Sequence, residues 1–307
     1  MLPLFNRLIS PANAHAFWIG VAFMVLGNFF FALNDTMGKI LVGTFAVSQV
    51  LAIRSIGAFL VLGPMLWAGR GTGRIRRPWL QLVRIGVATG DTALFYAAVA
   101  YLPLADVFTF YMAGPIYVAA MSSVMPGGAV GWRRWLVILA GFGGVVIALG
   151  PSFTVYSPGI LYALVGSFCY AGALMMNKVL VKTSDTALAT LQALGALIGG
   201  GAFAFFQWTP PGAVDIGLLL LLGIVACLAH LLISRAVKLT PVSVLAPFQY
   251  SLLLWGIGFG ILVFGDVPNE RILLGAAIIA TAGLFLLYSE SRARGRLRAD
   301  AVMKDFP

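Results

Sequence analysis

The sequence predicts an all-α integral membrane protein: a polytopic bundle of ten transmembrane helices, built as two inverted five-helix repeats with both termini in the cytoplasm. Three observations carry this expectation: the composition, ten long apolar runs and an internal repeat. Of the 307 residues, 61% are hydrophobic and only 10% are charged, whereas soluble domains carry about 25% charged residues. Most of the chain is therefore expected to face lipid or other apolar segments of the protein.

Transmembrane helices are expected where an apolar run of roughly 20 residues is uninterrupted. The runs are too long and too continuously apolar for the alternating pattern of a membrane strand. The first run continues into Asn34, Asp35 and Thr36 without a cleavage signal, so we expect it to be a retained span. The ten expected spans cover residues 17–36, 45–67, 79–101, 105–125, 132–150, 158–178, 186–208, 214–236, 242–264 and 270–289.

The distribution of Lys and Arg predicts the orientation, because short basic loops stay in the cytoplasm. Alternate connections hold nearly all of the basic residues, and the opposite side receives only Lys39 and Arg271. This asymmetry places both termini in the cytoplasm. It also accounts for the net charge of +10 without a nucleic-acid partner, and we expect the basic tail over residues 291–307 to lie near anionic lipid.

An internal repeat appears when the sequence is shifted by 139 residues against itself. GVAFMVLGNFFFALNDTMGKIL from Gly20 then aligns with GILYALVGSFCYAGALMMNKVL from Gly159. Because each copy holds five spans, an odd number, the second copy enters the bilayer inverted. We expect the first repeat over residues 1–150 and the second over residues 151–290, as one integrated membrane domain. Inverted repeats are typical of alternating-access carriers that hold cargo near mid-membrane.

These two copies, with the segments LADVFTFYMAGPIYVAAMSSVMPGG and VSVLAPFQYSLLLWGIGFGILVFGDVP, resemble the drug/metabolite transporter superfamily, EamA-type. Within it the chain looks closest to the YddG-like amino-acid exporters, and S-adenosylmethionine carriers have a similar APFQY-type ninth span. The resemblance implies a secondary transporter. Family patterns often place Glu at the end of the ninth span, where this chain has Asp266.

Two charged residues, Arg54 and Asp91, fall deep inside expected spans. Each lies nine or ten residues from the outer end of its span, which corresponds to a depth of roughly 14 Å. A charge at this depth is costly unless it is paired or wetted. We therefore expect Arg54 and Asp91 to pair, either as a structural ion pair or with one of them contacting the cargo.

The shift of 139 residues aligns Asp91 with His230, so the two side chains are expected at matching heights in the two halves. His230 can titrate near neutral pH, which suits proton coupling, but an interhelical hydrogen bond is the other interpretation. Further polar and aromatic side chains at mid-depth are expected to line a cavity for a small zwitterion. With Asp91 and His230, the expected substrate-binding residues are Asn28, Tyr96, Tyr111, Tyr170, Gln249 and Tyr250.

The function predicted from these features is export of amino acids, aromatic and other neutral ones favoured, across the cell inner membrane by alternating access. The alternative is a carrier of S-adenosylmethionine or another cationic drug or metabolite. No enzyme is expected, because the sequence offers no GxSxG, no HExxH and no P-loop. We also expect no cofactor and no metal. The expected partners are membrane lipid and a small-molecule substrate. We expect a monomer, since ten spans can enclose a site alone.

Overall fold

The structure of the chain is a computed structural model. It describes residues 11–69, 77–114, 116–117, 120–121, 132–149, 157–180, 183–239, 245, 248, 251–282, 284–285 and 288. All regular secondary structure in these ranges is helical. This confirms the all-α class for the described part of the chain.

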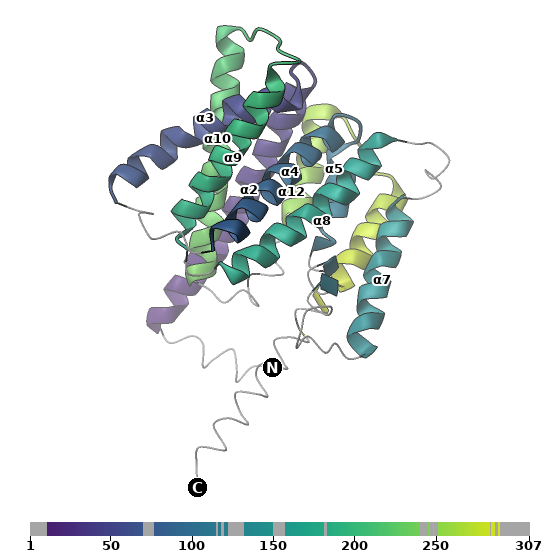
Figure 1. Cartoon of the computed structure of the whole chain (residues 1–307). Helices are drawn as coiled ribbons and strands as arrows, with labels where there is room; N and C mark the ends of the chain where they lie inside the picture. The colour runs from purple at the N-terminus through teal and green to yellow at the C-terminus, as the bar shows by residue number, and fades with distance from the viewer. Residues whose placement is uncertain are drawn as a thin grey trace.

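The helices lie close to the apolar runs predicted from the sequence, and their labels are those of Figure 1. They are α2 (Pro11–Val42), α3 (Val47–Trp67), α4 (Pro78–Val99), α5 (Leu104–Tyr111), α7 (Trp132–Leu149), α8 (Pro158–Val179), α9 (Asp185–Ala204), α10 (Ala213–Leu239), α12 (Ser251–Phe259) and the π-helix η2 (Gly260–Phe264). A further helix covers residues 270–282.

Five of these helices are long and apolar enough to cross a membrane. They cover Trp18–Val42, Val47–Trp67, Pro78–Val99, Thr186–Ala204 and Ala213–Ala236. Large apolar side chains point outward from the bundle; Leu262, for example, is 83% exposed. Such a surface suits a lipid environment. The count of ten spans and the cytoplasmic position of both termini stay predictions.

Helix α2 is longer than the sequence pattern suggested, because it continues past the polar residues at which the expected span ended. Several of these polar side chains form hydrogen bonds inside the bundle. The Thr36 hydroxyl donates to the Ala32 carbonyl at 2.7 Å, and the Asn34 amide donates to Asp35 Oδ1 at 2.8 Å. The helix therefore reaches Val42, and Asp35 lies within its apolar length rather than at its end.

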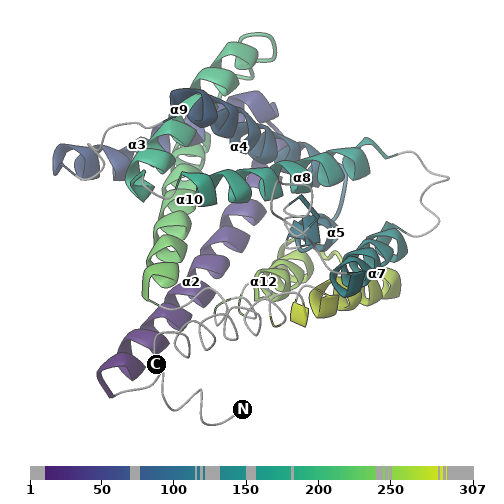
Figure 2. The same ribbon diagram turned by 60° about the horizontal axis from the view of Figure 1, so that its bottom comes forward.

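Helices from before residue 150 pack mainly on helices from after residue 157. Figures 1 and 2 show α2 beside α10, and the same relation holds for α3 with α9, α4 with α8, and α5 with α12. Helix α7 packs on the helix over residues 270–282, where Gly144 faces Ile278 and Ile279. A shift by 139 residues exchanges the α2–α10 pair with the α8–α4 pair. The contacts therefore agree with a two-fold relation between the halves.

Two helix backbones approach each other closely where α3 crosses α10. A Cβ atom on Gly223 would overlap the carbonyl oxygen of Arg54, and one on Gly57 would overlap the carbonyl oxygen of Leu220. Small residues allow such close backbone packing in membrane bundles. This crossing fixes the height and direction of Arg54 relative to α10.

A second tie between the halves joins the last turns of α2 to the segment after η2. Lys39 Nζ lies 2.8 Å from Asp266 Oδ2 and 4.4 Å from the centroid of the Phe264 ring. Asp106 at the start of α5 lies within electrostatic range of both charges. Lys39, which the basic-residue pattern leaves on the non-cytoplasmic side, is therefore held by an ion pair.

The α3–α10 crossing predicts a strong effect for Gly223→Ala. The added methyl group must push the two backbones apart, which typically costs about 1–3 kcal/mol. We expect thermal unfolding of the purified protein to shift down by several degrees. Gly217→Ala on the same helix is the matched control, because a Cβ there meets nothing within 4 Å. Equal unfolding temperatures for the two variants would contradict the packing described here.

The Lys39–Asp266 pair predicts that either neutral variant, Lys39→Gln or Asp266→Asn, lowers the unfolding temperature by about 2–4 °C, because a partly buried pair contributes about 1 kcal/mol. The exchanged pair Lys39→Asp with Asp266→Lys restores most of this loss. A double exchange that unfolds no later than either neutral variant would show that the pair does not stabilise the fold.

Candidate substrate site

A cluster of polar and charged side chains lies inside the bundle, where α2, α3 and α4 meet. Its charged members are Asp35 from α2, Arg54 from α3 and Asp91 from α4, and all three are partly buried. Each interacts electrostatically with the other two. We call Asp35, Arg54, Asp91 and the Tyr96 phenol the central polar cluster.

Arg54 is held by the phenol of Tyr96. Arg54 Nη1 donates to the Tyr96 hydroxyl at 2.7 Å, and the guanidinium carbon lies 5.2 Å from the centroid of the same ring. Tyr96 is fully buried, and its hydroxyl also accepts a longer bond of 3.4 Å from the Asn34 amide. One phenol therefore connects side chains of α2, α3 and α4.

Asp91 has no ion-pair partner among the described residues. Its Oδ1 is buried without a hydrogen bond, and its backbone carbonyl accepts from the Tyr111 hydroxyl at 3.3 Å. The expected direct pair with Arg54 is not formed, because the guanidinium is directed to Tyr96 instead. Arg54 and Asp91 remain within electrostatic range, and a coupling role for them stays a prediction.

Asp35 was not among the residues selected from the sequence. Asp35 lies at the end of the expected first span, over residues 17–36, so the sequence pattern places it at the edge of the apolar run rather than inside it. The repeat itself held a signal, because the positions matching Asn34 and Asp35 in the second copy are Ala173 and Leu174. A polar pair present in one half alone marks an asymmetric site.

Aromatic rings extend the central polar cluster toward α8. The centroids of Tyr111 and Tyr170 are 5.9 Å apart, and Phe95 meets the Tyr111 ring edge-on at 5.2 Å. Tyr170 also lies within electrostatic range of Asp91. Of the expected site residues, the structure thus brings together Asp91, Tyr96, Tyr111 and Tyr170, with Arg54.

The other expected residues lie elsewhere in the bundle. His230 on α10 is exposed and meets the Phe31 ring edge-on at 4.7 Å, within electrostatic range of Arg54. The Asn28 amide donates to the Phe248 carbonyl at 2.8 Å and to the Ser251 hydroxyl at 2.9 Å, so it ties α2 to the start of α12. Proton coupling through His230 stays a prediction.

Two of the expected residues, Gln249 and Tyr250, lie outside the described residues. In the described part of the chain, no three His, Cys, Asp or Glu side chains gather closely enough to hold a metal ion.

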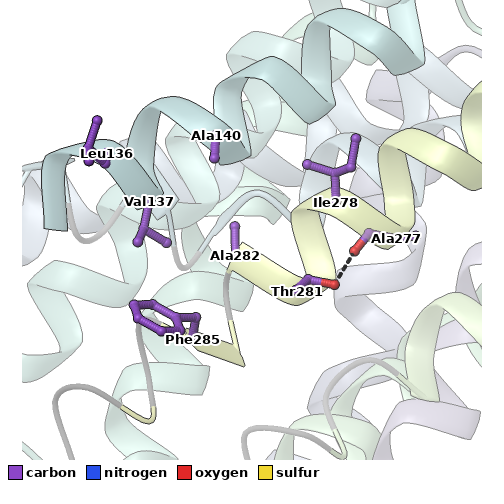
Figure 3. Close-up of a pocket in the computed structure, with 8 residues that line it drawn as sticks. All are labelled: Leu136, Val137, Ala140, Ala277, Ile278, Thr281, Ala282 and Phe285. Atoms are coloured by element: carbon purple, nitrogen blue, oxygen red, sulfur yellow. Dashed lines mark hydrogen bonds between the residues drawn. The ribbon is translucent and has the colours of Figure 1, made fainter. Parts of the chain in front are cut away.

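A hollow of about 490 Å³ lies between α7 and the helix over residues 270–282, and none of its lining residues belongs to the central polar cluster. Figure 3 shows the side chains that line it: Leu136, Val137, Ala140, Ala277, Ile278, Thr281, Ala282 and Phe285. Its one hydroxyl, on Thr281, donates to the Ala277 carbonyl at 2.7 Å. This apolar hollow offers nothing to balance a charge, so it is not the candidate site for a polar substrate.

Curated proteins of similar sequence are bacterial transporters. The S-adenosylmethionine uptake transporter of Rickettsia bellii is 27% identical over 91% of this chain and 96% of its own length. The riboflavin transporter of Rhizobium johnstonii is 27% identical over 92% and 95%. The pseudopaline exporter of Pseudomonas aeruginosa is 26% identical over 87% and 95%. None of these three is named as an amino-acid exporter, so they do not support the narrower resemblance to YddG-like proteins.

A family model and a solved structure agree with this similarity. A crystal structure with 17% sequence identity superposes with a TM-score of 0.62, covering 91% of this chain and 99% of that one, which shows a shared fold. The model of the EamA-like transporter family matches twice, over residues 18–150 and 157–289. The chain therefore belongs to the EamA-like transporter family, and it is a membrane transporter.

Proposed function

We propose that the chain is a secondary carrier of a small organic cation that also bears a flat ring, of the S-adenosylmethionine type. The observation that carries this proposal is the charge balance of the central polar cluster. Two carboxylates, Asp35 and Asp91, share one guanidinium, and that guanidinium is already held by the Tyr96 phenol. A cargo with a net positive charge restores the balance.

The electrostatic argument rests on the cost of charge inside a membrane. An uncompensated charge at mid-depth costs several kcal/mol unless a partner or water offsets it. S-adenosylmethionine carries a sulfonium, an ammonium and a carboxylate. Its cationic groups suit Asp91 and Asp35, and its carboxylate suits the donors of Arg54 that Tyr96 does not use, since a guanidinium has five N–H groups.

The aromatic side chains support a ring-bearing cargo. Tyr111 and Tyr170 lie within electrostatic range of Asp91, and Phe95 packs edge-on against Tyr111. Flat rings such as adenine stack favourably on aromatic side chains. Cationic groups are also attracted to the faces of such rings. An inorganic or aliphatic cation would have no ring to stack on these aromatic side chains.

The amino-acid export expected from the sequence is less well supported. A neutral zwitterion balances one carboxylate and one guanidinium, whereas this cluster contains two carboxylates. The relatives named for S-adenosylmethionine uptake, riboflavin transport and pseudopaline export also favour the alternative that the sequence left open. The direction of net flux is set by the gradients across the membrane.

We further propose the membrane arrangement in which this carrier acts. Ten spans form two inverted halves, over residues 1–150 and 151–290, with both termini and the tail over residues 291–307 in the cytoplasm. The site lies near the midplane of the inner membrane, where inverted halves meet. The monomer is the working unit, because the halves of one chain already contact each other throughout the bundle.

Counterflow in proteoliposomes tests the proposed cargo. Vesicles loaded with unlabelled S-adenosylmethionine are expected to accumulate labelled S-adenosylmethionine transiently and saturably, and more strongly than labelled phenylalanine in phenylalanine-loaded vesicles. Riboflavin and choline, offered as competitors, separate a ring requirement from a charge requirement. Counterflow of phenylalanine alone would restore amino-acid transport, and no counterflow of any probe would overturn the proposal.

Neutral variants of the two carboxylates test the site. Asp91→Asn and Asp35→Asn each remove one attraction to a cationic cargo, so we expect KM for S-adenosylmethionine to rise about tenfold, which corresponds to about 1.4 kcal/mol. Glu270→Gln, which changes an exposed carboxylate, is the matched control and should keep the parental KM. Parental KM in both Asp variants would remove these residues from the site.

A further inference from the structure

Tyr96 occupies a position that determines where the only guanidinium of the central polar cluster points. Its hydroxyl accepts from Arg54 Nη1 at 2.7 Å, while its ring lies beneath the guanidinium carbon. These two contacts use one donor and one face of Arg54. Neither brings the guanidinium to a carboxylate, although Asp35 and Asp91 both lie within electrostatic range.

The Tyr96 ring is itself held by one face of α2. A Cβ atom on Gly38 would overlap the ring at Cε1, so only glycine allows the ring to lie this close to the helix. One turn earlier on α2, the Asn34 amide donates to the Tyr96 hydroxyl at 3.4 Å. Glycine below the ring and an amide at its hydroxyl therefore define where the phenol sits.

Without the phenol, Arg54 would have a stronger partner available. Charge-assisted hydrogen bonds to a carboxylate are roughly twice as strong as neutral ones, and arginine suits carboxylates because of its planar fork of donors. Asp91 is the obvious acceptor, since its buried Oδ1 has no hydrogen bond. An Arg54–Asp91 pair would neutralise Asp91 and leave Asp35 as the carboxylate that the site offers to a cation.

We propose that Tyr96 is a positioning residue that sets the charge preference of the site: by holding Arg54 away from Asp91, it keeps that carboxylate free for a cationic group of the cargo. The consequence for transport rests on the proposed function. The coupling between Tyr96 and Asp91 does not, because it concerns the empty protein.

A double-mutant cycle on the empty protein tests this coupling. Thermal unfolding is measured for the parent, Tyr96→Phe, Asp91→Asn and the double variant, all at one pH and in one detergent. In the parent, Asp91→Asn removes a carboxyl group that has no ion-pair partner; in the Tyr96→Phe background it removes the new partner of Arg54. Asp91→Asn changes the unfolding temperature in each background. We expect this change to be less favourable by about 2–4 °C in the Tyr96→Phe background than in the parent.

A distant buried phenol provides the control for this cycle. Tyr117 packs against Phe142 and Phe168, and Tyr117→Phe removes a hydroxyl without changing the contacts of Arg54. Asp91→Asn should cause the same shift with or without Tyr117→Phe. Equal shifts in the parent and in the Tyr96→Phe background would overturn the proposal, whatever the cargo is.

Transport selectivity provides the second measurement. In Tyr96→Phe, we expect KM for S-adenosylmethionine to rise about tenfold while inhibition by a zwitterion, phenylalanine, is weakened less than threefold. Gly38→Ala displaces the ring without removing a polar atom. It should likewise raise the ratio of KM for S-adenosylmethionine to the inhibition constant of phenylalanine. Gly86→Ala on α4, where a Cβ meets nothing within 4 Å, should leave it unchanged.

The two measurements separate this proposal from the proposed function. A parent that moves no cationic probe contradicts the proposed cargo, while the unfolding cycle still decides the role of Tyr96. Equal loss of affinity for the cation and the zwitterion in Tyr96→Phe would show that the phenol supports the site as a whole, and the assignment of charge preference to Tyr96 would be wrong.

Discussion

The hydrogen bond from Arg54 to the Tyr96 hydroxyl satisfies a cation inside an apolar bundle with a neutral partner. A guanidinium at this depth usually needs a carboxylate, since a buried charge is costly when it stands alone. Here two carboxylates lie near it and the phenol receives the bond instead. The cluster therefore contains two carboxyl groups for one guanidinium, and neither carboxyl group forms an ion pair with it.

Glycine contacts create the geometry on which that bond depends. Gly223 lets α10 approach the carbonyl of Arg54, and Gly38 lets the Cε1 edge of the Tyr96 ring lie close to α2. In lipid, helix association draws on close packing rather than on burial from water, so these backbone approaches hold both sides of the bond.

The halves of the chain carry unequal charges inside the bundle, although the sequence repeats. Contacts between helices follow the exchange of the two halves, whereas the charges do not: Asp35, Arg54 and Asp91 all come from residues before 150, and the positions matching Asn34 and Asp35 are apolar. A symmetric scaffold thus carries an asymmetric site. Lys39 and Asp266 join the halves on the side that the basic-residue pattern assigns to the exterior, which makes the two ends of the bundle chemically different as well.

The sequence by itself determined that the chain is helical, apolar enough for a membrane and internally repeated, because composition and the length of apolar runs depend on no distant contact. It also identified Arg54, Asp91, Tyr96, Tyr111 and Tyr170 by the cost of placing such groups in lipid. Only the tertiary structure decided which of them touch. Helix α2 continues through Asp35 because its polar residues find partners within α2 and on Tyr96 of α4, and Arg54 turns to Tyr96 rather than to Asp91 because side-chain direction depends on how α2, α3 and α4 pack. Depth along a helix is readable from residue order, but the direction around the helix axis relative to other helices is fixed only by packing.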